Sequence, residues 1–327
     1  MPKVFITRQI PDAGIQLLKD KGYEVIVGPE GMVARSELLE KVKGVDAILS
    51  ILTEKIDKEV LDTAGSNLKI VANYAMGFDN IDVNEAKQRK IFVTNTPGVL
   101  TDTVSEHSMA LILALAHRVV EGDQFIRDGK YKGWGPMLLV GEDLKDKTLG
   151  VIGFGAIGKR VAEIAISGFK MKVLYYDIKP NLEFEKQYGA KYASLEEVLK
   201  NSDFVSLHTP LNEATKHMIS IKELNMMKKT AYIINTARGP VIDENALFNA
   251  LYTNGIKGAA LDVFEYEPAI AGTKFDTQEL LKLNNVIFTP HTASASLETR
   301  STMAKIAANN IIEALEGKTP TNLVYQL

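Results

Sequence analysis

The sequence predicts an α/β protein built from two parallel-sheet domains, and three observations carry this prediction. Short apolar runs alternate with helix patterns along most of the chain, which is typical of βα units on a parallel sheet. A glycine-rich segment at residues 147–177 has the pattern of a βαβ unit. Finally, 327 residues exceed what one hydrophobic core usually holds. We therefore expect two Rossmann-like or flavodoxin-like domains with a cleft between them.

The elements of the first domain follow in order up to about residue 97. Strand-type runs are expected at 3–7, 24–27, 47–51, 69–72 and 91–94, with helices at 12–21, 36–43, 58–64 and 84–89. Pro97 and Gly98 then break the chain. Apolar residues at helical spacing next predict one long connecting helix at 102–129.

The second domain begins with a strand at 148–152, and further strands are expected at 173–176, 204–208, 232–236, 259–263 and 286–289. A final helix at 297–315 has no strand left to accompany it, so we expect it to return to the first domain. The predicted domains are therefore 1–98 with 292–327, and 99–291.

Composition excludes several functional classes. The net charge of −3 contains no basic block, which makes nucleic acid and anionic membranes poor partners. The absence of cysteine excludes disulfides and cysteine-based metal clusters, and we expect no metal site. The N-terminus lacks the apolar core of a signal peptide, and the most apolar run, 109–116, is shorter than the ~20 residues of a membrane helix. We expect a cytoplasmic protein.

The glycine-rich segment matches a dinucleotide-binding fingerprint. Gly153, Gly155 and Gly158 form G-x-G-x-x-G between an apolar strand and a helix pattern. In that motif the glycines allow a tight turn, close approach of a pyrophosphate, and close packing of helix on strand. The phosphates would bind the N–H groups of Ala156 and Ile157. A P-loop is excluded because Arg160 stands where the Mg²⁺-binding hydroxyl is required.

An acidic residue at the end of the second strand of this unit indicates the cofactor. Asp177 lies 177 − 158 = 19 residues after the last glycine, where a carboxylate accepts the ribose hydroxyls of NAD and repels the 2′-phosphate of NADP. Lys179 nearby weakens this preference. We therefore assign NAD(H) binding to residues 99–291.

Three predicted strands of this domain end in residues suited to chemistry. Arg238 follows one strand and offers a fork of donors for a carboxylate; a surface ion pair is the alternative. Asp262 and Glu267 stand out in the acidic run 261–268, and His291 ends a third strand. Imidazole titrates near neutrality, so His291 is the best general acid and base. We regard His107, His117 and His217 as structural, and His208 as lining the cofactor cleft or taking part in chemistry.

The motifs at 73–82, 93–97, 153–158, 235–239, 261–268 and 289–291 resemble those of D-isomer-specific 2-hydroxyacid dehydrogenases, most closely the glyoxylate/hydroxypyruvate reductase branch. The resemblance implies that Arg238 binds the substrate carboxylate, that His291 donates the proton, and that Glu267 orients His291 and favours its protonated form. It also implies a substrate domain at 1–98 with 292–327, in which the N–H groups of Met76 and Gly77 hold the carboxylate.

The resemblance further implies two groups of binding residues. Ser294 would line the substrate pocket with Met76, Gly77, Arg238 and His291. The NAD-binding residues would be Thr103, Gly153, Gly155, Ala156, Ile157, Gly158, Asp177, Pro210, Thr236, Ala237, Arg238, Asp262 and His291, with Asp262 near the carboxamide.

Departures from related patterns refine this expectation. Glu267 argues against formate dehydrogenases, which carry glutamine there, and the loop 74–78 lacks the lysine of phosphite dehydrogenases. Ala293 replaces a glycine common in the family, which bears on substrate size. Two alternatives remain open: a D-lactate-type dehydrogenase, and an NAD(H)-sensing binding protein without catalysis.

The segment that follows the predicted long helix indicates assembly. Residues 132–140 hold the only tryptophan, Trp134, among several apolar residues, and burial of such a patch in an isologous dimer is the commonest solution. The resemblance agrees, because this segment forms the dimer contact in glyoxylate/hydroxypyruvate reductases. We expect a homodimer, with Trp134 near the partner's substrate pocket.

Overall fold

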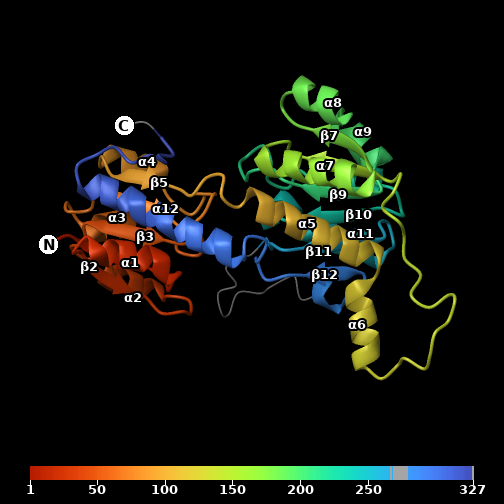
Figure 1. Cartoon of the computed structure of the whole chain (residues 1–327), viewed down its shortest axis with the longest axis horizontal. Helices are drawn as coiled ribbons and strands as arrows, with labels where there is room; N and C mark the ends of the chain where they lie inside the picture. The colour runs from red at the N-terminus through yellow and green to blue at the C-terminus, as the bar shows by residue number, and fades with distance from the viewer. Residues whose placement is uncertain (266, 268–278, 326–327) are drawn as a thin grey trace. The chain divides into compact units, whose positions relative to one another are not determined.

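The computed structural model describes residues 1–265, 267 and 279–325. The chain divides into two compact units (Figure 1). Unit 1 comprises Met1–Leu100 and Ala295–Leu327, and unit 2 comprises Thr101–Ser294. Each unit contains one parallel sheet, so the predicted fold class is confirmed. The boundaries expected from the sequence, 98/99 and 291/292, lie a few residues from these.

Unit 1 contains a five-stranded sheet in the order β2-β1-β3-β4-β5, with every pairing parallel. Its strands are β1 (Lys3–Ile6), β2 (Glu24–Val27), β3 (Ala47–Ser50), β4 (Ile70–Asn73) and β5 (Phe92–Thr94). Its helices are α1 (Asp12–Asp20), α2 (Arg35–Lys41), α3 (Lys58–Ala64), α4 (Val83–Gln88) and α12 (Leu297–Leu315).

The two faces of this sheet bury different helices. Phe5, Ile48 and Val71 belong to a core shared with α2, α3 and α4, whereas α1 and α12 pack together and α12 also contacts β3, β4 and β5. A Cβ at Gly14 would lie 2.6 Å from the carbonyl oxygen of Ala304, so glycine lets α1 and α12 approach closely. Helix α12 thus joins the sheet of unit 1, as the sequence suggested.

Unit 2 contains a seven-stranded parallel sheet in the order β12-β11-β10-β9-β6-β7-β8. Its strands are β6 (Thr148–Ile152), β7 (Lys172–Tyr176), β8 (Lys191–Tyr192), β9 (Phe204–Leu207), β10 (Tyr232–Asn235), β11 (Gly258–Leu261) and β12 (Val286–Phe288). Its helices are α5 (Thr101–Ala116), α6 (Val119–Arg127), α7 (Ala156–Phe169), α8 (Leu182–Tyr188), α9 (Leu195–Asn201), α10 (Ile221–Met226) and α11 (Glu244–Tyr252), with 3₁₀ turns η1 (Gly239–Val241) and η3 (Leu280–Lys282).

The strand order of unit 2 reverses at β6. From β6 the sheet grows in one direction through β7 and β8, and in the other through β9 to β12. Alternate side chains of the strands enter two cores: Val151, with neighbours from α5 and α7, lies in one, and Ile152, with neighbours from α9 and α11, in the other. Open α/β sheets bind ligands at such a reversal, outside the carboxyl ends of the strands. Ligand binding is therefore expected at the carboxyl ends of the strands on either side of β6.

The predicted single helix at 102–129 is wrong, because it breaks into α5 and α6. Arg118 at the break has φ +54° in the left-handed region. The amide of Glu142 donates to the carbonyl of Ala116 at 2.8 Å, and a Cβ at Gly141 would lie 2.2 Å from the same oxygen. A distant segment therefore caps α5, which the apolar spacing of the helix sequence could not reveal. Two-residue strand β8 was also not predicted.

Among the helices that the structure describes, none combines the length and hydropathy needed to cross a membrane.

Candidate active site

The dinucleotide fingerprint forms the turn between β6 and α7. Gly153 has φ +90°, and a Cβ there would lie 2.6 Å from the carbonyl carbon of His208, which follows β9. A Cβ at Gly158 would lie 2.1 Å from the carbonyl oxygen of Gly153. The space around a Cβ at Gly155 is open. The three glycines thus serve a tight turn, close helix packing, and free access to the backbone.

This turn fits the diphosphate of a dinucleotide. Gly155 is the N-cap of α7, which begins at Ala156. The first N–H groups of a helix have no partner within it, and the helix dipole favours an anion there. Because Gly155 leaves the approach open, the amides of Ala156 and Ile157 could hold a pyrophosphate.

Asp177 follows β7 beside the same turn. Its Oδ2 accepts from the amide of Phe154 at 2.5 Å, and its Oδ1 accepts from its neighbour Ile178 at 2.6 Å. The carboxylate is half-buried, and each oxygen keeps a further lone pair for a ribose hydroxyl. The glycine turn and the acidic residue are therefore tied together, as a site for an adenosine ribose and its phosphates requires.

The loop after β10 carries Arg238. Asn235 shapes this loop, since its Oδ1 accepts from the amide of Ala237 at 3.0 Å and its Nδ2 donates to the carbonyl of Arg238 at 2.9 Å. A Cβ at Gly239 would lie 1.8 Å from the carbonyl carbon of Phe264. Glycine at this position therefore lets the β10 loop lie directly against the segment that leads to Glu267.

His291 and Glu267 form a hydrogen-bonded pair. Nδ1 of His291 lies 2.7 Å from Oε2 of Glu267, and Oε1 of Glu267 accepts from the amide of Phe264 at 3.2 Å. Their side chains are 31% and 29% exposed, so both are accessible to a ligand. Contact through Nδ1 leaves Nε2 of the imidazole for proton transfer. The pairing of these two residues, which are 24 positions apart, was expected from the resemblance.

The backbone turn that carries His291 is held by Asp262. Oδ1 of this buried carboxylate accepts from the hydroxyl of Thr289 at 2.6 Å and from the amide of Thr292 at 2.9 Å, while Oδ2 accepts from the amide of Ala293 at 2.9 Å. Burial raises the pKa of Asp262, but the nearby imidazole of His107 and the hydrogen bonds from Thr289 and the turn amides outweigh it and hold the pKa below its usual value. The carboxylate is thus ionised and fixed.

The remaining predicted residues lie in several loops and in the first turn of α5. Within unit 2, the hydroxyl of Thr236 lies 2.9 Å from that of Ser108 on α5. Thr103 lies in the first turn of the same helix. The exposed Pro210 follows β9, and the half-buried Ser294 follows Ala293. In unit 1, Met76 and Gly77 follow β4, and their carbonyls accept from Nδ2 of Asn95 at 2.7 Å and Nδ2 of Asn73 at 2.8 Å. These two bonds hold the loop in place, and its role in substrate binding stays a prediction.

Two interactions escaped the sequence reasoning. Glu265, in the acidic run, lies 2.6 Å from Nε2 of His217, and its amide donates to the buried Glu244 at 2.6 Å. His107, which we regarded as structural, contacts Thr289 of the His291 turn at 3.1 Å. Neither pair shows a local sequence signal, because the partners lie 48 and 182 positions apart. Tyr266 and Pro268 of the acidic motif lie outside the described residues.

Across residues 1–265, 267 and 279–325, no group of three or more His, Asp or Glu side chains is placed to hold a metal ion.

Comparisons with known proteins agree with this geometry. The family model of the D-isomer specific 2-hydroxyacid dehydrogenase, NAD binding domain, matches residues 109–293. Glyoxylate reductase from Thermococcus litoralis is 49% identical, over 99% of this chain and 96% of the relative. The solved structure of the TT0316 protein from Thermus thermophilus has a TM-score of 0.91 at 40% identity, covering 99% of this chain and all of that one.

A glyoxylate reductase from Paecilomyes thermophila has a TM-score of 0.84 at 31% identity, covering 99% of this chain and 98% of that structure. Identity of this extent over the whole chain confirms the family, the fold class and the NAD-binding assignment that the sequence predicted. The chain belongs to the D-isomer specific 2-hydroxyacid dehydrogenase family and is an NAD-dependent oxidoreductase.

Proposed function

We propose that this enzyme reduces a small 2-keto acid, glyoxylate or hydroxypyruvate, to the corresponding D-2-hydroxy acid with NADH. The observation that carries the proposal is the His291–Glu267 pair, whose imidazole and carboxylate lie 2.7 Å apart in an accessible position. The relative from Thermococcus litoralis, named glyoxylate reductase, supports the choice of substrate.

The reaction needs one hydride and one proton. NADH, when bound, supplies the hydride that adds to the carbonyl carbon of the keto acid. Nε2 of His291 gives its proton to the carbonyl oxygen, which becomes the hydroxyl of the product. Glu267 accepts at Nδ1 and fixes the orientation and tautomer of the ring. Hydride, proton and keto acid together account for the atoms of the hydroxy acid.

Arg238 is proposed to bind the substrate. Its guanidinium is planar, always charged, and able to hold a carboxylate through two parallel hydrogen bonds. We also propose that Met76, Gly77 and Ser294 contact the substrate. The methyl group of Ala293, where many relatives have glycine, would favour a short keto acid over a bulky one.

Substrate turnover is the decisive test. NADH consumption is measured with a panel that contains glyoxylate, hydroxypyruvate, pyruvate and bulkier 2-keto acids, and we expect the highest kcat/KM for the first two. A preference for pyruvate would favour a D-lactate-type dehydrogenase. Tight NADH binding without turnover of any keto acid would refute the enzyme proposal and leave the NAD(H)-sensing alternative.

The preference for NADH over NADPH is proposed to depend on Asp177. In Asp177→Ser the carboxylate that accepts from the ribose and repels a 2′-phosphate is lost. The variant should bind NADH more weakly and gain relative activity with NADPH. If the wild-type enzyme already prefers NADPH, Lys179 outweighs Asp177 and the proposal is wrong.

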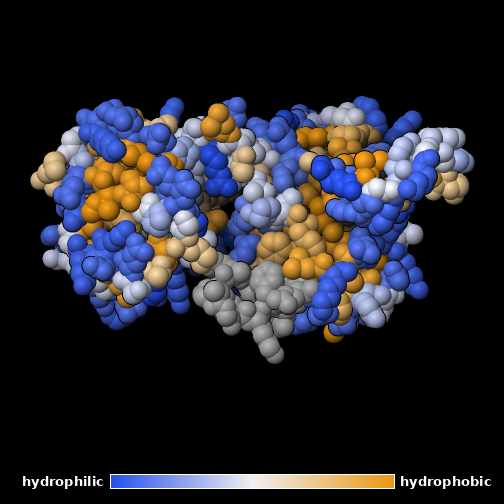
Figure 2. Space-filling view, turned by 90° about the horizontal axis from the view of Figure 1, so that it is seen from below, coloured by the Kyte–Doolittle hydropathy of each residue, from blue (hydrophilic) through white to orange (hydrophobic). Residues whose placement is uncertain are grey.

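A homodimer is the assembly that we propose, with the enzyme acting in the cytoplasm. Apolar side chains on α6 and in the segment that follows it are exposed, including Val119 at 56%, Trp134 at 84% and Met137 at 81%. Hydrophobic surface is visible on the side of unit 2 seen in Figure 2. Burying such a surface against a second copy is favourable.

The dimer and the position of Trp134 have separate tests. Light scattering at micromolar concentration should return twice the chain mass of 36.0 kDa, and a value near 36.0 kDa would refute the dimer. We further propose that Trp134 lies near the partner's substrate pocket. If Trp134→Ala leaves kcat/KM unchanged for every accepted keto acid, that role fails while the dimer stands.

A further inference from the structure

The turn that carries His291 connects through side chains to helix α5. Nε2 of His107, on α5, lies 3.1 Å from Oγ1 of Thr289, and Oγ1 of Thr289 donates to Oδ1 of Asp262 at 2.6 Å. Nε2 of His107 also lies 3.5 Å from the same carboxylate oxygen. A chain of polar groups thus leads from α5 to the carboxylate that holds the turn.

The number of hydrogens available to these three polar groups shows which of them donates to which, and therefore what His107 does. A threonine hydroxyl has one hydrogen, and that of Thr289 is used on Asp262. Its oxygen must therefore accept from the imidazole, so Nε2 of His107 carries the hydrogen. Hydrogen bonds in such a series strengthen one another, and His107 thereby supports the bond that Thr289 gives to Asp262.

His291 depends on that support because its backbone is strained. It has φ +52°, a left-handed conformation that non-glycine residues adopt only where their surroundings enforce it. The enforcing contacts are the bonds from Thr292 and Ala293 to the Asp262 carboxylate, and the bond from the His291 amide to the Asp262 carbonyl at 2.9 Å. If the carboxylate shifts, the imidazole of His291 shifts with the turn.

We propose that His107 is a positioning residue for the reaction, acting through Thr289 and Asp262 to hold His291 where it transfers its proton. This inference rests on the proposed role of His291. It assigns no contact with substrate or cofactor to His107.

The experiment compares three variants of the full-length enzyme. His107→Leu removes the donor. His107→Gln restores it, because the amide nitrogen of glutamine occupies the position of an imidazole Nε2. His117→Gln is the matched control, since His117 directly follows the same helix and is exposed. Should His107→Leu not fold, His107→Asn replaces it, because its amide is too short to reach Thr289.

Two readouts separate positioning from a purely structural role. Displacement of a catalytic group by about 1 Å costs up to roughly 100-fold in rate, so His107→Leu should lower kcat about 10- to 100-fold while KM for NADH stays unchanged. Amide hydrogen exchange of peptides covering 289–296 should become faster in that variant. His107→Gln should recover both quantities, and His117→Gln should change neither.

The outcomes distinguish this inference from the function on which it rests. Unchanged kcat and exchange in His107→Leu overturn the inference, and so does a His107→Gln variant as impaired as His107→Leu. A raised KM for NADH at unchanged kcat also overturns it. If the wild-type enzyme reduces no keto acid, the proposed function fails, and hydrogen exchange alone decides whether His107 holds the turn.

Discussion

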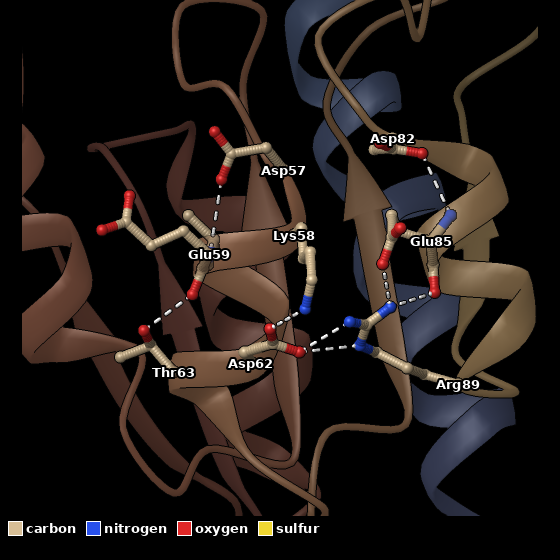
Figure 3. A network of polar contacts seen from close by, with 9 residues as sticks. Asp57, Lys58, Glu59, Asp62, Thr63, Asp82, Glu85 and Arg89 are labelled. Atoms are coloured by element: carbon tan, nitrogen blue, oxygen red, sulfur yellow. Dashed lines mark hydrogen bonds and ion pairs between the residues drawn. The ribbon is translucent and has the colours of Figure 1, made fainter.

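Two carboxylates of this enzyme, Asp262 in unit 2 and Asp62 in unit 1, both gather several donors but in opposite surroundings. The side chain of Asp262 has no exposed surface and accepts from one hydroxyl and two backbone amides of a single turn. That of Asp62 is 48% exposed. Figure 3 shows it between Lys58 on its own helix, α3, and Arg89 at the end of α4.

The surface network is built from flexible charges. Asp62 lies 2.5 Å from Nζ of Lys58 and 2.6 Å from a guanidinium nitrogen of Arg89, which also pairs with Glu85. Lys58 and Asp62 border a groove of ≈ 730 Å³. Water and salt screen such pairs, and ordering two long side chains opposes their attraction. The comparison teaches that the number of partners does not measure the importance of a carboxylate: Asp262 is itself fully buried, whereas Asp62 is open to water.

The largest effect is expected at the residue that the buried network serves. His291→Ala removes the proposed proton donor, which should lower kcat by roughly 10²- to 10⁴-fold while the affinity for NADH stays close to wild type. Steady-state kinetics and NADH titration measure the two quantities. Asp62→Ala, in the surface network, is the matched control and should keep the wild-type kcat. An undiminished kcat in His291→Ala would remove this residue from the mechanism.

The next effect concerns the turn itself. Asp262→Ala leaves the partly buried hydroxyl of Thr289 and amide of Thr292, and the buried amide of Ala293, without their acceptor. A buried unsatisfied donor costs about 1–3 kcal/mol. We expect the free energy of unfolding to fall by roughly 3 kcal/mol or more, as measured by urea denaturation. The loss should persist at high salt, because it does not depend on screened charges. If the loss of unfolding free energy vanished in about 1 M salt, Asp262 would stabilise the protein through screened charge pairs, as Asp62 does.

A smaller effect is expected on the pH dependence of stability, and it comes from the buried His208 of unit 2. Burial lowers the pKa of His208, beside the glycine turn, to about 3, whereas an unfolded histidine titrates near ~6.5. Between these values the unfolded chain binds the extra proton. His208 therefore contributes its full stability above about pH 6.5 and loses it progressively as the pH falls toward 3.

The carboxylates respond in a lower window. The pKa values of both Asp262 and Asp62 are lowered, so their contributions persist above the ordinary aspartate value of about 3.9 and are lost only below it. Denaturation midpoints at about pH 7.5 and 5 should thus isolate His208, and the decrease between them should shrink in His208→Gln. An equal decrease in wild type and variant would contradict this assignment.

The sequence alone was sufficient to predict structural features that depend on residues close together along the chain. Buried β-strands such as β6 and β10, and helix α12, follow from apolar runs and their periodicity. The φ of +90° at Gly153 and the close packing of Gly158 on the carbonyl of Gly153 both require glycine within one turn. Each of these features is set by neighbours along the chain, so its signal is present in a short window.

Long-range contacts were not predictable in the same way. The break between α5 and α6 depends on Gly141 and Glu142, which pack against Ala116 from a later segment. Asp262 was recognised as well placed, but nothing in its neighbourhood showed that its carboxylate would accept from Thr289, 27 positions away, or that His107 would join it. Tertiary structure decides which polar residue meets which.

The smallest effect, and the sharpest test of the comparison, is expected for Asp62→Ala. Removal of this carboxylate leaves Lys58 and Arg89 accessible to water, and Arg89 keeps Glu85 as a partner, so no buried charge is stranded. The urea midpoint should move only slightly at low ionic strength. In about 1 M salt, where the Debye length is about 3 Å, the difference from wild type should disappear. A salt-resistant loss as large as that of Asp262→Ala would show that the ion pairs between α3 and α4 hold unit 1 together, and exposure would then no longer separate the two carboxylates.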